Sequence, residues 1–220
     1  MDETPQDADS ATAPKAKIPV LFELVALVLL SLATVGMAWC SYQAAAWGGV
    51  SQRTMNQSAI AGRRAAANTL ESQQLKLVDV LLFSQYINAR ATSNETLARF
   101  YSDRFRDEAK TAFVAWMASR PFENSNAPPH PFVTNLYQPR ILKEAALAET
   151  ESQRLWRQAG EAGRTGRSYV LITVLLASSL FCGGTAAKFE KHGIRRAVLA
   201  LGLAAFVFSA VRLVLLPVQL

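Results

Sequence analysis

The side chains that most often hold metals or act as nucleophiles are scarce in this chain of 220 residues, which has two His and two Cys. No further His, Cys or carboxylate stands at metal-ligand spacing from His130 or His192. The sequence also lacks a phosphate-binding glycine loop, a nucleophile elbow and a Cys-x-x-Cys pair. We therefore expect no catalytic residues, no metal and no cofactor, and a protein that is not an enzyme.

Two charged side chains stand inside long apolar segments, where a charge is costly and often marks an ion path. Glu23 lies early in the segment 18–40, and Arg212 lies late in the segment 197–216. These positions place the two charges near opposite faces of a membrane. We expect each side chain to reach nearby headgroups, and we keep an ion path as the alternative.

Three apolar segments are each long enough to cross lipid as a helix, and they cover 18–40, 169–187 and 197–216. The chain is 50% hydrophobic and 18% charged, which exceeds the apolar content that one soluble core needs. We therefore expect an all-α integral membrane protein with three transmembrane helices. Cys40 and Cys182 would lie at different depths of antiparallel spans, about 20 Å apart, and remain free thiols.

The first apolar segment has a second interpretation as a cleaved signal peptide, with Gly36–Ala38 as the cleavage site. The polar tail 1–17 opens with several acidic residues, unlike the basic start of a signal peptide. A lipoprotein site ending at Cys40 is a weaker alternative, because bulky Trp39 stands where a small residue is required. We favour an uncleaved span.

The basic connector 188–196 indicates the orientation of the spans, because short basic loops stay in the cytoplasm. Lys15 and Lys17 agree with a cytoplasmic N-terminus, whereas the four Arg between 154 and 167 argue for the opposite orientation. We expect the N-terminus and 188–196 to be cytoplasmic and 41–168 to be periplasmic or extracellular. A short tail, 217–220, follows the third span.

Aromatic side chains gather where the first span ends and the second begins. Trp39, Tyr42 and Trp47 flank the end of the first span, and Tyr169 opens the second. Such rings prefer the boundary between lipid and water, so we expect all four at one membrane surface.

The segment 41–168 is polar but patterned, and it predicts an extramembrane antiparallel helical stalk. A long helix is predicted over 51–91, with Gly48-Gly49 as a possible bend. Its apolar face would contain Leu75, Val78, Leu82 and Tyr86.

A second helix, capped by Ser93 or Asn94, would carry an aromatic stripe as far as Trp116 and end at Pro121. Five Pro then predict a loop over 120–139. This loop would form either the tip of the stalk or a strap over the aromatic stripe.

A third helix follows the loop, with a seam typical of a coiled coil at Ile141, Ala145, Ala148, Leu155 and Ala159. We expect it to pack against the helix of Leu75 to Tyr86. Glycines at 160, 163 and 166 predict a hinge or a tight crossing point just before the second span.

Small residues in the second span predict close helix packing. Ser179 and Gly183 are four residues apart and Gly184 lies beside them, which is a small-xxx-small face. The pattern suits packing within the chain or between protomers.

The net charge of +6 raises the question of a nucleic-acid partner. In 99–110, however, Arg99, Arg104, Arg106 and Lys110 alternate with Asp103, Asp107 and Glu108. This alternation indicates surface ion pairs and excludes the one-sided positive face that nucleic acid requires. The lipid bilayer is the expected partner of the positive charge.

The string Trp39-Cys40-Ser41-Tyr42-Gln43-Ala44, followed by Trp47-Gly48, is similar to the W-x-x-Y-Q-A signature of uncharacterised bacterial inner-membrane proteins, a domain of unknown function. The entry into the second span at Tyr169 and the basic connector also resemble that family. Arg167-Ser168 stand where its members commonly have Asn or Asp. The resemblance implies a three-span protein of the bacterial inner membrane and no particular activity.

The sequence therefore predicts a structural or interaction protein that self-associates or binds a membrane-protein partner through its stalk. A subunit of an oligomeric channel or transporter is the alternative function. No span shows the regular polar stripe that a water-filled path requires, which favours the first interpretation.

Overall fold

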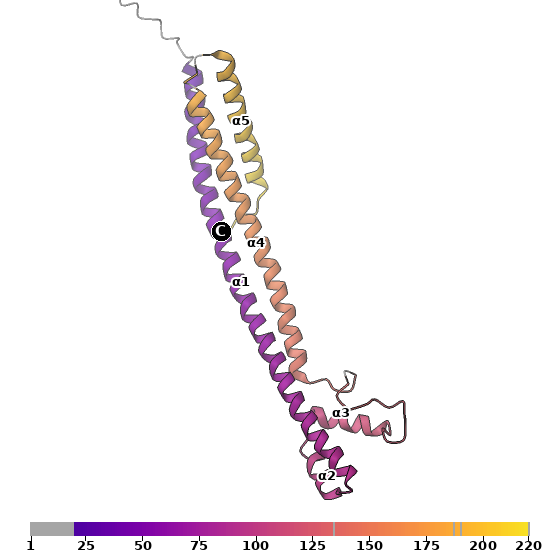
Figure 1. Ribbon diagram of the computed structural model, residues 1–220. Helices are drawn as coiled ribbons and strands as arrows, with labels where there is room; N and C mark the ends of the chain where they lie inside the picture. The colour runs from indigo at the N-terminus through magenta and orange to yellow at the C-terminus, as the bar shows by residue number, and fades with distance from the viewer. Residues whose placement is uncertain (1–19, 134, 187, 190, 220) are drawn as a thin grey trace, which may run out of the picture. The chain divides into compact units, whose positions relative to one another are not determined.

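The computed structural model describes residues 20–133, 135–186, 188, 189 and 191–219. This part of the chain contains five α-helices and no strand, so the all-helical prediction is confirmed for it. Figure 1 labels them as α1 (Val20–Ala91), α2 (Glu95–Ser102), α3 (Asp107–Ala118), α4 (Arg140–Ala186) and α5 (His192–Leu215). The tail expected over 1–17 lies outside the described residues.

The chain forms two compact units, to which α1 and α4 both contribute. The terminal unit comprises 1–47 and 164–220, and the middle unit comprises 48–163. The middle unit thus falls inside the expected extramembrane segment 41–168.

Two helices of the described part are long and apolar enough to cross a membrane, namely α4 and α5. The most apolar windows of these helices have mean hydropathies of 1.8 and 2.4. The expected first span, 18–40, is not one of these two. It coincides with the start of α1, where residues 18 and 19 and the side chains of 20–26 and 29 lie outside the described residues. Glu23 is one of these side chains.

The connector between the two apolar helices is shorter than the expected range 188–196. Helix α5 already begins at His192, and the backbone N–H of Arg195 donates to the carbonyl of Lys191 at 3.1 Å. The basic residues after His192 therefore form the first turns of α5, because their long side chains suit a helix.

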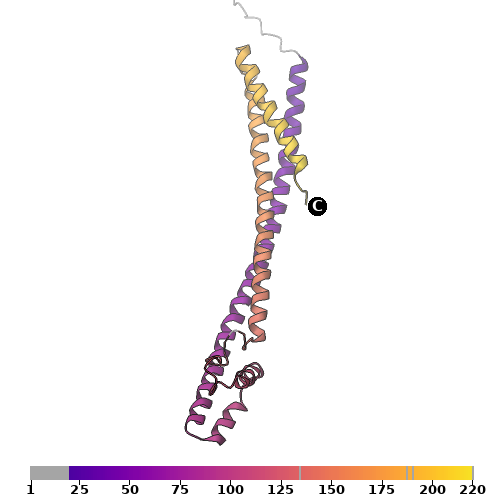
Figure 2. The ribbon, with the colours of Figure 1, turned by 90° about the vertical axis from the view of Figure 1, so that its right-hand side faces the viewer.

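In the terminal unit, α1, α4 and α5 share one small core. Ala33 and Cys40 of α1 pack with Tyr169, Ile172 and Leu176 of α4, and side chains of α5 adjoin them. Figure 1 shows α5 beside α4, and in Figure 2 it runs obliquely across α4 toward α1. The core is narrow, so most of the apolar surface of these helices points outward.

In the middle unit, α4 runs antiparallel to α1. The Oγ of Ser51 donates to the carbonyl of Ala159 at 2.8 Å, and the Oγ of Ser58 donates to the carbonyl of Ser152 at 2.8 Å. The expected seam of α4 is confirmed, because each of its residues is buried or half-buried.

The helix expected to receive this seam, which contains Leu75 and Tyr86, is indeed its partner α1, but the stretch that receives it lies nearer the start of that helix. The seam packs against the stretch of α1 around Ser51 and Ser58, where small side chains allow two helices to approach closely. A Cβ on Gly62 of α1 would come within 3.2 Å of the Ser152 Oγ, which shows how near the two helices lie.

Burial along α1 follows a seven-residue interval that differs from the predicted face. Ser58, Ala65, Ser72, Asp79 and Tyr86 are all buried. Val78, which was expected in the core, is exposed instead. The prediction missed this face because three of its five members are polar.

The predicted second helix is divided into α2 and α3, which is a correction. Asn94 caps α2, since its Oδ1 accepts from the N–H of Leu97 at 3.0 Å. The chain turns between Asp103 and Arg106, and this turn buries Phe105 against Tyr86. One continuous helix would not bring Phe105 to α1. Helix α3 ends at Ala118, before Pro121.

The Pro-rich loop 120–139 is a strap over the aromatic residues. The indole Nε1 of Trp116 donates to the carbonyl of Pro128 at 2.7 Å. Phe132 and Tyr137 are buried in the same cluster as Tyr86, and Phe132 meets the Phe83 ring edge-on at 5.7 Å. The loop therefore completes the core, and the alternative of a free tip loses its support.

The glycines along α1 and α4 do not interrupt either helix. Both helices are continuous through Gly48-Gly49 and through the glycines at 160, 163 and 166. A Cβ on Gly163 would stand 3.2 Å from the Ser51 Oγ, whereas one on Gly160 would meet nothing within 4 Å. Gly163 thus marks a tight crossing of the two helices, in place of a hinge.

We predict that Gly163→Leu destabilises the protein by about 1–3 kcal/mol, because the new side chain must push α1 away from α4. Gly160→Leu is the matched control, since the helix propensity changes equally and the site is open. Thermal unfolding of both variants in detergent, followed by circular dichroism, measures the difference. Equal stability of the two variants would contradict the tight crossing.

Candidate functional site

The described residues contain two polar clusters that join separate elements, one in each unit. The first surrounds Asp79 in the middle unit. The second surrounds residues 217–219 in the terminal unit.

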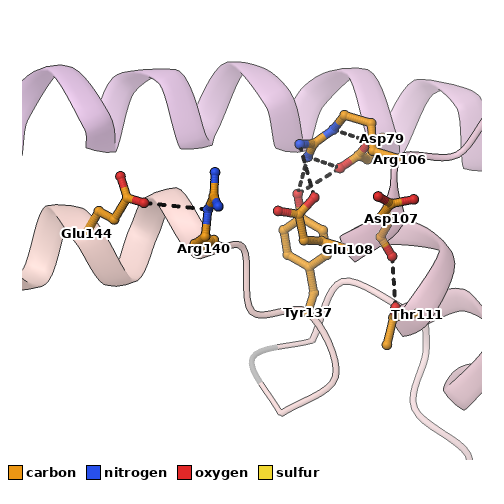
Figure 3. A network of polar contacts seen from close by, with 8 residues as sticks. All are labelled: Asp79, Arg106, Asp107, Glu108, Thr111, Tyr137, Arg140 and Glu144. Carbon is orange, nitrogen blue, oxygen red and sulfur yellow. Dashed lines mark hydrogen bonds and ion pairs between the residues drawn. The ribbon is translucent and has the colours of Figure 1, made fainter.

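Asp79 of α1 is fully buried, with an exposed fraction of 0%. Arg106, at the start of α3, binds it with two nitrogens, Nη2 to Oδ2 at 2.6 Å and Nε to Oδ1 at 3.1 Å. The Tyr137 hydroxyl, from the strap, donates to the same Oδ2 at 2.7 Å (Figure 3). Three elements distant in sequence thus meet at one carboxylate.

The remaining polar atoms of this cluster are also satisfied. Arg106 Nη2 donates to the Tyr137 hydroxyl oxygen at 3.0 Å, and Arg106 Nη1 lies 3.5 Å from a carboxylate oxygen of Glu108. The hydrogen bond to Asp79 raises the pKa of Arg106 above its usual value. Burial, reinforced by the hydrogen bond to Asp79, raises the pKa of Tyr137. The arrangement is therefore a charged Arg–Asp pair closed by a protonated tyrosine.

The surface ion pairs predicted for 99–110 are only partly found. Arg106 does approach Glu108, but its main partner is the buried Asp79 on another helix. The Arg104 guanidinium carbon lies 3.4 Å from the centre of the Phe100 ring, which is a cation–π contact.

Asp79 is the functional candidate that the sequence reasoning missed. The available signal was its place in α1, between apolar residues and seven positions from Ser72 and Tyr86. A carboxylate on a buried helical face requires a cationic partner, and the Arg-rich segment that follows supplies one. Nothing in the sequence identified Arg106 among the neighbouring arginines.

The cluster can fasten elements together, but it does not resemble a reaction centre. Its carboxylate accepts three hydrogen bonds and offers no free oxygen to a substrate. In the part of the chain that the structure describes, no group of three His, Cys, Asp or Glu side chains is placed to hold a metal ion.

The second cluster, which we call the tail clasp, consists of Gln43, Trp47 and Tyr169. Gln43 is fully buried, and its Nε2 donates to the carbonyl of Gln219 at 2.9 Å while its Oε1 accepts from the Gln219 N–H at 2.9 Å. Trp47 Nε1 and the Tyr169 hydroxyl both donate to the carbonyl of Pro217, at 3.0 and 3.1 Å. The clasp thus satisfies the backbone beyond α5.

The four aromatic residues expected at a membrane surface therefore divide into two pairs. Trp39 and Tyr42 are exposed, and their ring centroids lie 5.9 Å apart. Trp47 and Tyr169 belong to the tail clasp, and Tyr169 is 0% exposed. The first pair presents its rings to the surroundings, whereas Trp47 is half-buried and Tyr169 is buried.

Of the expected packing face of the second span, only Ser179 has a contact within the chain that depends on its side chain. Ser179 Oγ donates to the carbonyl of Gly202 in α5 at 2.7 Å. A Cβ on Gly202 would come within 2.9 Å of the Cys182 Cβ, whereas one on Gly183 or Gly184 would meet nothing within 4 Å. Gly202, which the sequence reasoning did not single out, is thus the residue that needs to be glycine.

The two charges expected inside the apolar segments and the two cysteines are the remaining predicted positions. Arg212 is exposed on α5, and Glu23 lies outside the described side chains, so their expected relation to headgroups stays a prediction. Cys40 and Cys182 are both free thiols, as expected.

Comparison of the chain with protein-family models, with curated proteins and with solved structures yields no match. The resemblance of the string 39–44 to a bacterial membrane family therefore stays a prediction. The geometry alone must support any function proposed for the chain.

We predict that Tyr137→Phe lowers the free energy of unfolding by about 1 kcal/mol at neutral pH, because Asp79 loses one hydrogen bond. The folded-state pKa of Tyr137 is raised, so its contribution is complete below the unfolded value of about 10 and declines as the pH rises above it. The stability of the wild type should therefore fall more steeply above about pH 10 than that of Tyr137→Phe.

Denaturant unfolding from pH 7 upward measures this difference, with Tyr101→Phe as the control outside the cluster. Parallel pH profiles for the wild type and Tyr137→Phe would contradict the role assigned to the hydroxyl.

We predict that Gln43→Ala releases the segment 217–219, because both backbone hydrogen bonds of Gln219 are lost. Hydrogen exchange of the C-terminal peptide in detergent should speed up about tenfold, the equivalent of one to two hydrogen bonds. Tyr42→Ala is the matched control, since Tyr42 is the exposed neighbour of Gln43. Equal exchange in the two variants would show that the clasp does not hold the tail.

Proposed function

We propose that the chain is a three-span membrane protein that serves as a scaffold, presenting its middle unit to another polypeptide or to a second copy. The observation that carries this proposal is how little of its apolar helices is buried. Only 22% of the most apolar window of α4 and 11% of that of α5 are buried. A core helix of a water-soluble protein would be buried over most of its length, so these helices need lipid around them.

The outward side chains of the terminal unit support insertion into lipid. Val174 and Phe181 of α4 and Leu201, Val207 and Val214 of α5 are all exposed. Hydrocarbon is the surrounding in which such surfaces are stable, and continuous helices satisfy the backbone groups there.

The start of α1 supports a third crossing. Leu32 and Val35 are exposed there, whereas Ala33 and Cys40 pack against α4. The tail clasp joins Gln43 and Trp47, which follow this segment, to residues 217–219 after α5. The end of α5 is thus level with the far end of the first segment, as three crossings require.

The middle unit supports a binding role over a catalytic one. Its titratable cluster faces inward and is saturated, while Leu77, Leu81, Leu147 and Trp156 are exposed. Exposed apolar side chains at this density mark surfaces that meet another protein. The channel alternative has less support, because Ser179 donates its hydrogen bond within the chain.

The basic connector and the lysines before the first span favour an orientation with 48–163 outside the cytoplasm. In a background of Cys40→Ala and Cys182→Ala, we predict that a membrane-impermeant thiol reagent labels Ser125→Cys in intact cells and does not label Gly193→Cys. Both positions are exposed, so access across the membrane decides the result.

Mass spectrometry of the labelled protein from intact and from lysed cells measures this difference, and lysed cells supply the control in which both positions react. The reverse labelling would overturn the orientation. Extraction of the protein by alkaline carbonate would overturn membrane insertion, and ion flux through reconstituted protein that is lost in Gly183→Leu would favour the channel.

A further inference from the structure

The paired helices of the middle unit form an open groove on one side. Its floor is apolar and consists of Ile60 and Ala61 from α1 with Leu147 and Ala148 from α4. Ile60 is 60% exposed and Leu147 is 71% exposed, so no described part of the chain covers this floor.

The rims of the groove carry opposite charges. Arg64 stands on the α1 rim, and Glu144 and Glu151 stand on the α4 rim. Ser58 lies against Ser152, so six residues further along α1 correspond to about six residues back along α4. Arg64 therefore lies at the height between Glu151 and Glu144.

We propose that this groove binds the same groove of a second copy, forming a four-helix bundle around a twofold axis parallel to the helices. The inference rests on the proposed function, because anchoring both copies in one membrane gives their helices the same direction. With such an axis, α1 of each copy lies beside α4 of the other.

Charge complementarity is the reason for choosing a second copy as the occupant. A twofold axis parallel to the helices keeps every residue at its own height. Arg64 of each copy then faces Glu144 and Glu151 of the other, so both rims pair opposite charges while the apolar floors meet. The present partners of the two glutamates, Arg140 at 3.5 Å and Arg154 at 2.6 Å, are on the surface, where such pairs are weakly held.

A second exposed surface of the middle unit provides the control. Leu70, Leu77 and Leu81 form a stripe on α1, and Leu77 is 64% exposed. Glu71 and Lys76 are exposed near this stripe, but in the described part of the chain no pocket with charged rims of opposite sign is lined by the three leucines. A substitution at Leu77 therefore distinguishes dimerisation through the groove from nonspecific hydrophobic association.

A charge-swap experiment on the full chain in lipid nanodiscs tests the proposal, with particle mass as the readout. The first variant is Arg64→Glu, and the second combines Glu144→Arg with Glu151→Arg. Each variant alone places like charges on both rims, and we expect its dimerisation to weaken about tenfold or more. An equimolar mixture restores opposite charges on both rims, so it should dimerise like the wild type.

Leu147→Glu should also weaken the dimer about tenfold, because it places a charge on the floor, whereas Leu77→Glu should leave it unchanged. The proposal is overturned if the wild type is monomeric at all concentrations tested. It is overturned equally if the mixture fails to recover, or if Leu77→Glu disrupts the dimer and Leu147→Glu does not.

The outcomes also separate this inference from the proposed function. The wild type could instead be monomeric, resist carbonate extraction and bind another membrane polypeptide through the groove. This result would overturn the proposal of a second copy as the occupant and would leave the proposed scaffold function standing. Release of the protein from the membrane by alkaline carbonate would overturn the proposed function as a membrane scaffold, whatever the particle mass.

Discussion

The proposed membrane insertion imposes one constraint on the rest of the structure, because backbone N–H and C=O groups in lipid must satisfy each other within their own helix. It fits the apolar part of α4, which runs through Gly183 and Gly184 without a break. It also allows apolar side chains to point outward, so the terminal unit needs only the narrow core around Cys40 and Tyr169. Where the backbone leaves the helix after α5, the tail clasp supplies hydrogen-bond partners for the backbone groups of Pro217 and Gln219.

The middle unit holds two helices and a Pro-rich strap together with few large side chains. Serine and glycine let α1 and α4 approach closely, and a compact aromatic cluster fills the space beneath the strap. Asp79 ties this cluster to α3 and to the strap. Breaking a fully buried ion pair costs about 3–5 kcal/mol, and the cost here is smaller because the Arg106 side chain is 29% exposed.

The sequence was sufficient for the features that depend on local physics. Helical periodicity predicted the seam of α4, the Asn94 cap follows from the unpaired amides of a helix start, and the free thiols follow from the depth of the two cysteines. The sequence did not predict how segments far apart in the chain pack against each other. The stretch of α1 that receives the seam, the turn between α2 and α3, and the contact of Asp79 with Arg106 depend on packing that no local pattern specifies. Trp47 and Tyr169 show the same limit, because their aromatic character indicated a membrane surface while their hydrogen bonds serve the tail.

The central claim is that α5 and the part of α4 that begins at Tyr169 stand in hydrocarbon with their exposed side chains toward lipid. A nitroxide attached at Val207→Cys, in protein without its native cysteines and reconstituted in vesicles, tests this most directly through its collisions with dissolved oxygen and with a water-soluble nickel complex. The account predicts frequent collisions with oxygen and few with nickel at Val207, and the opposite ratio for a nitroxide at Leu77→Cys in the middle unit. Nickel collisions at Val207 as frequent as those at Leu77 would place α5 in water and contradict the account.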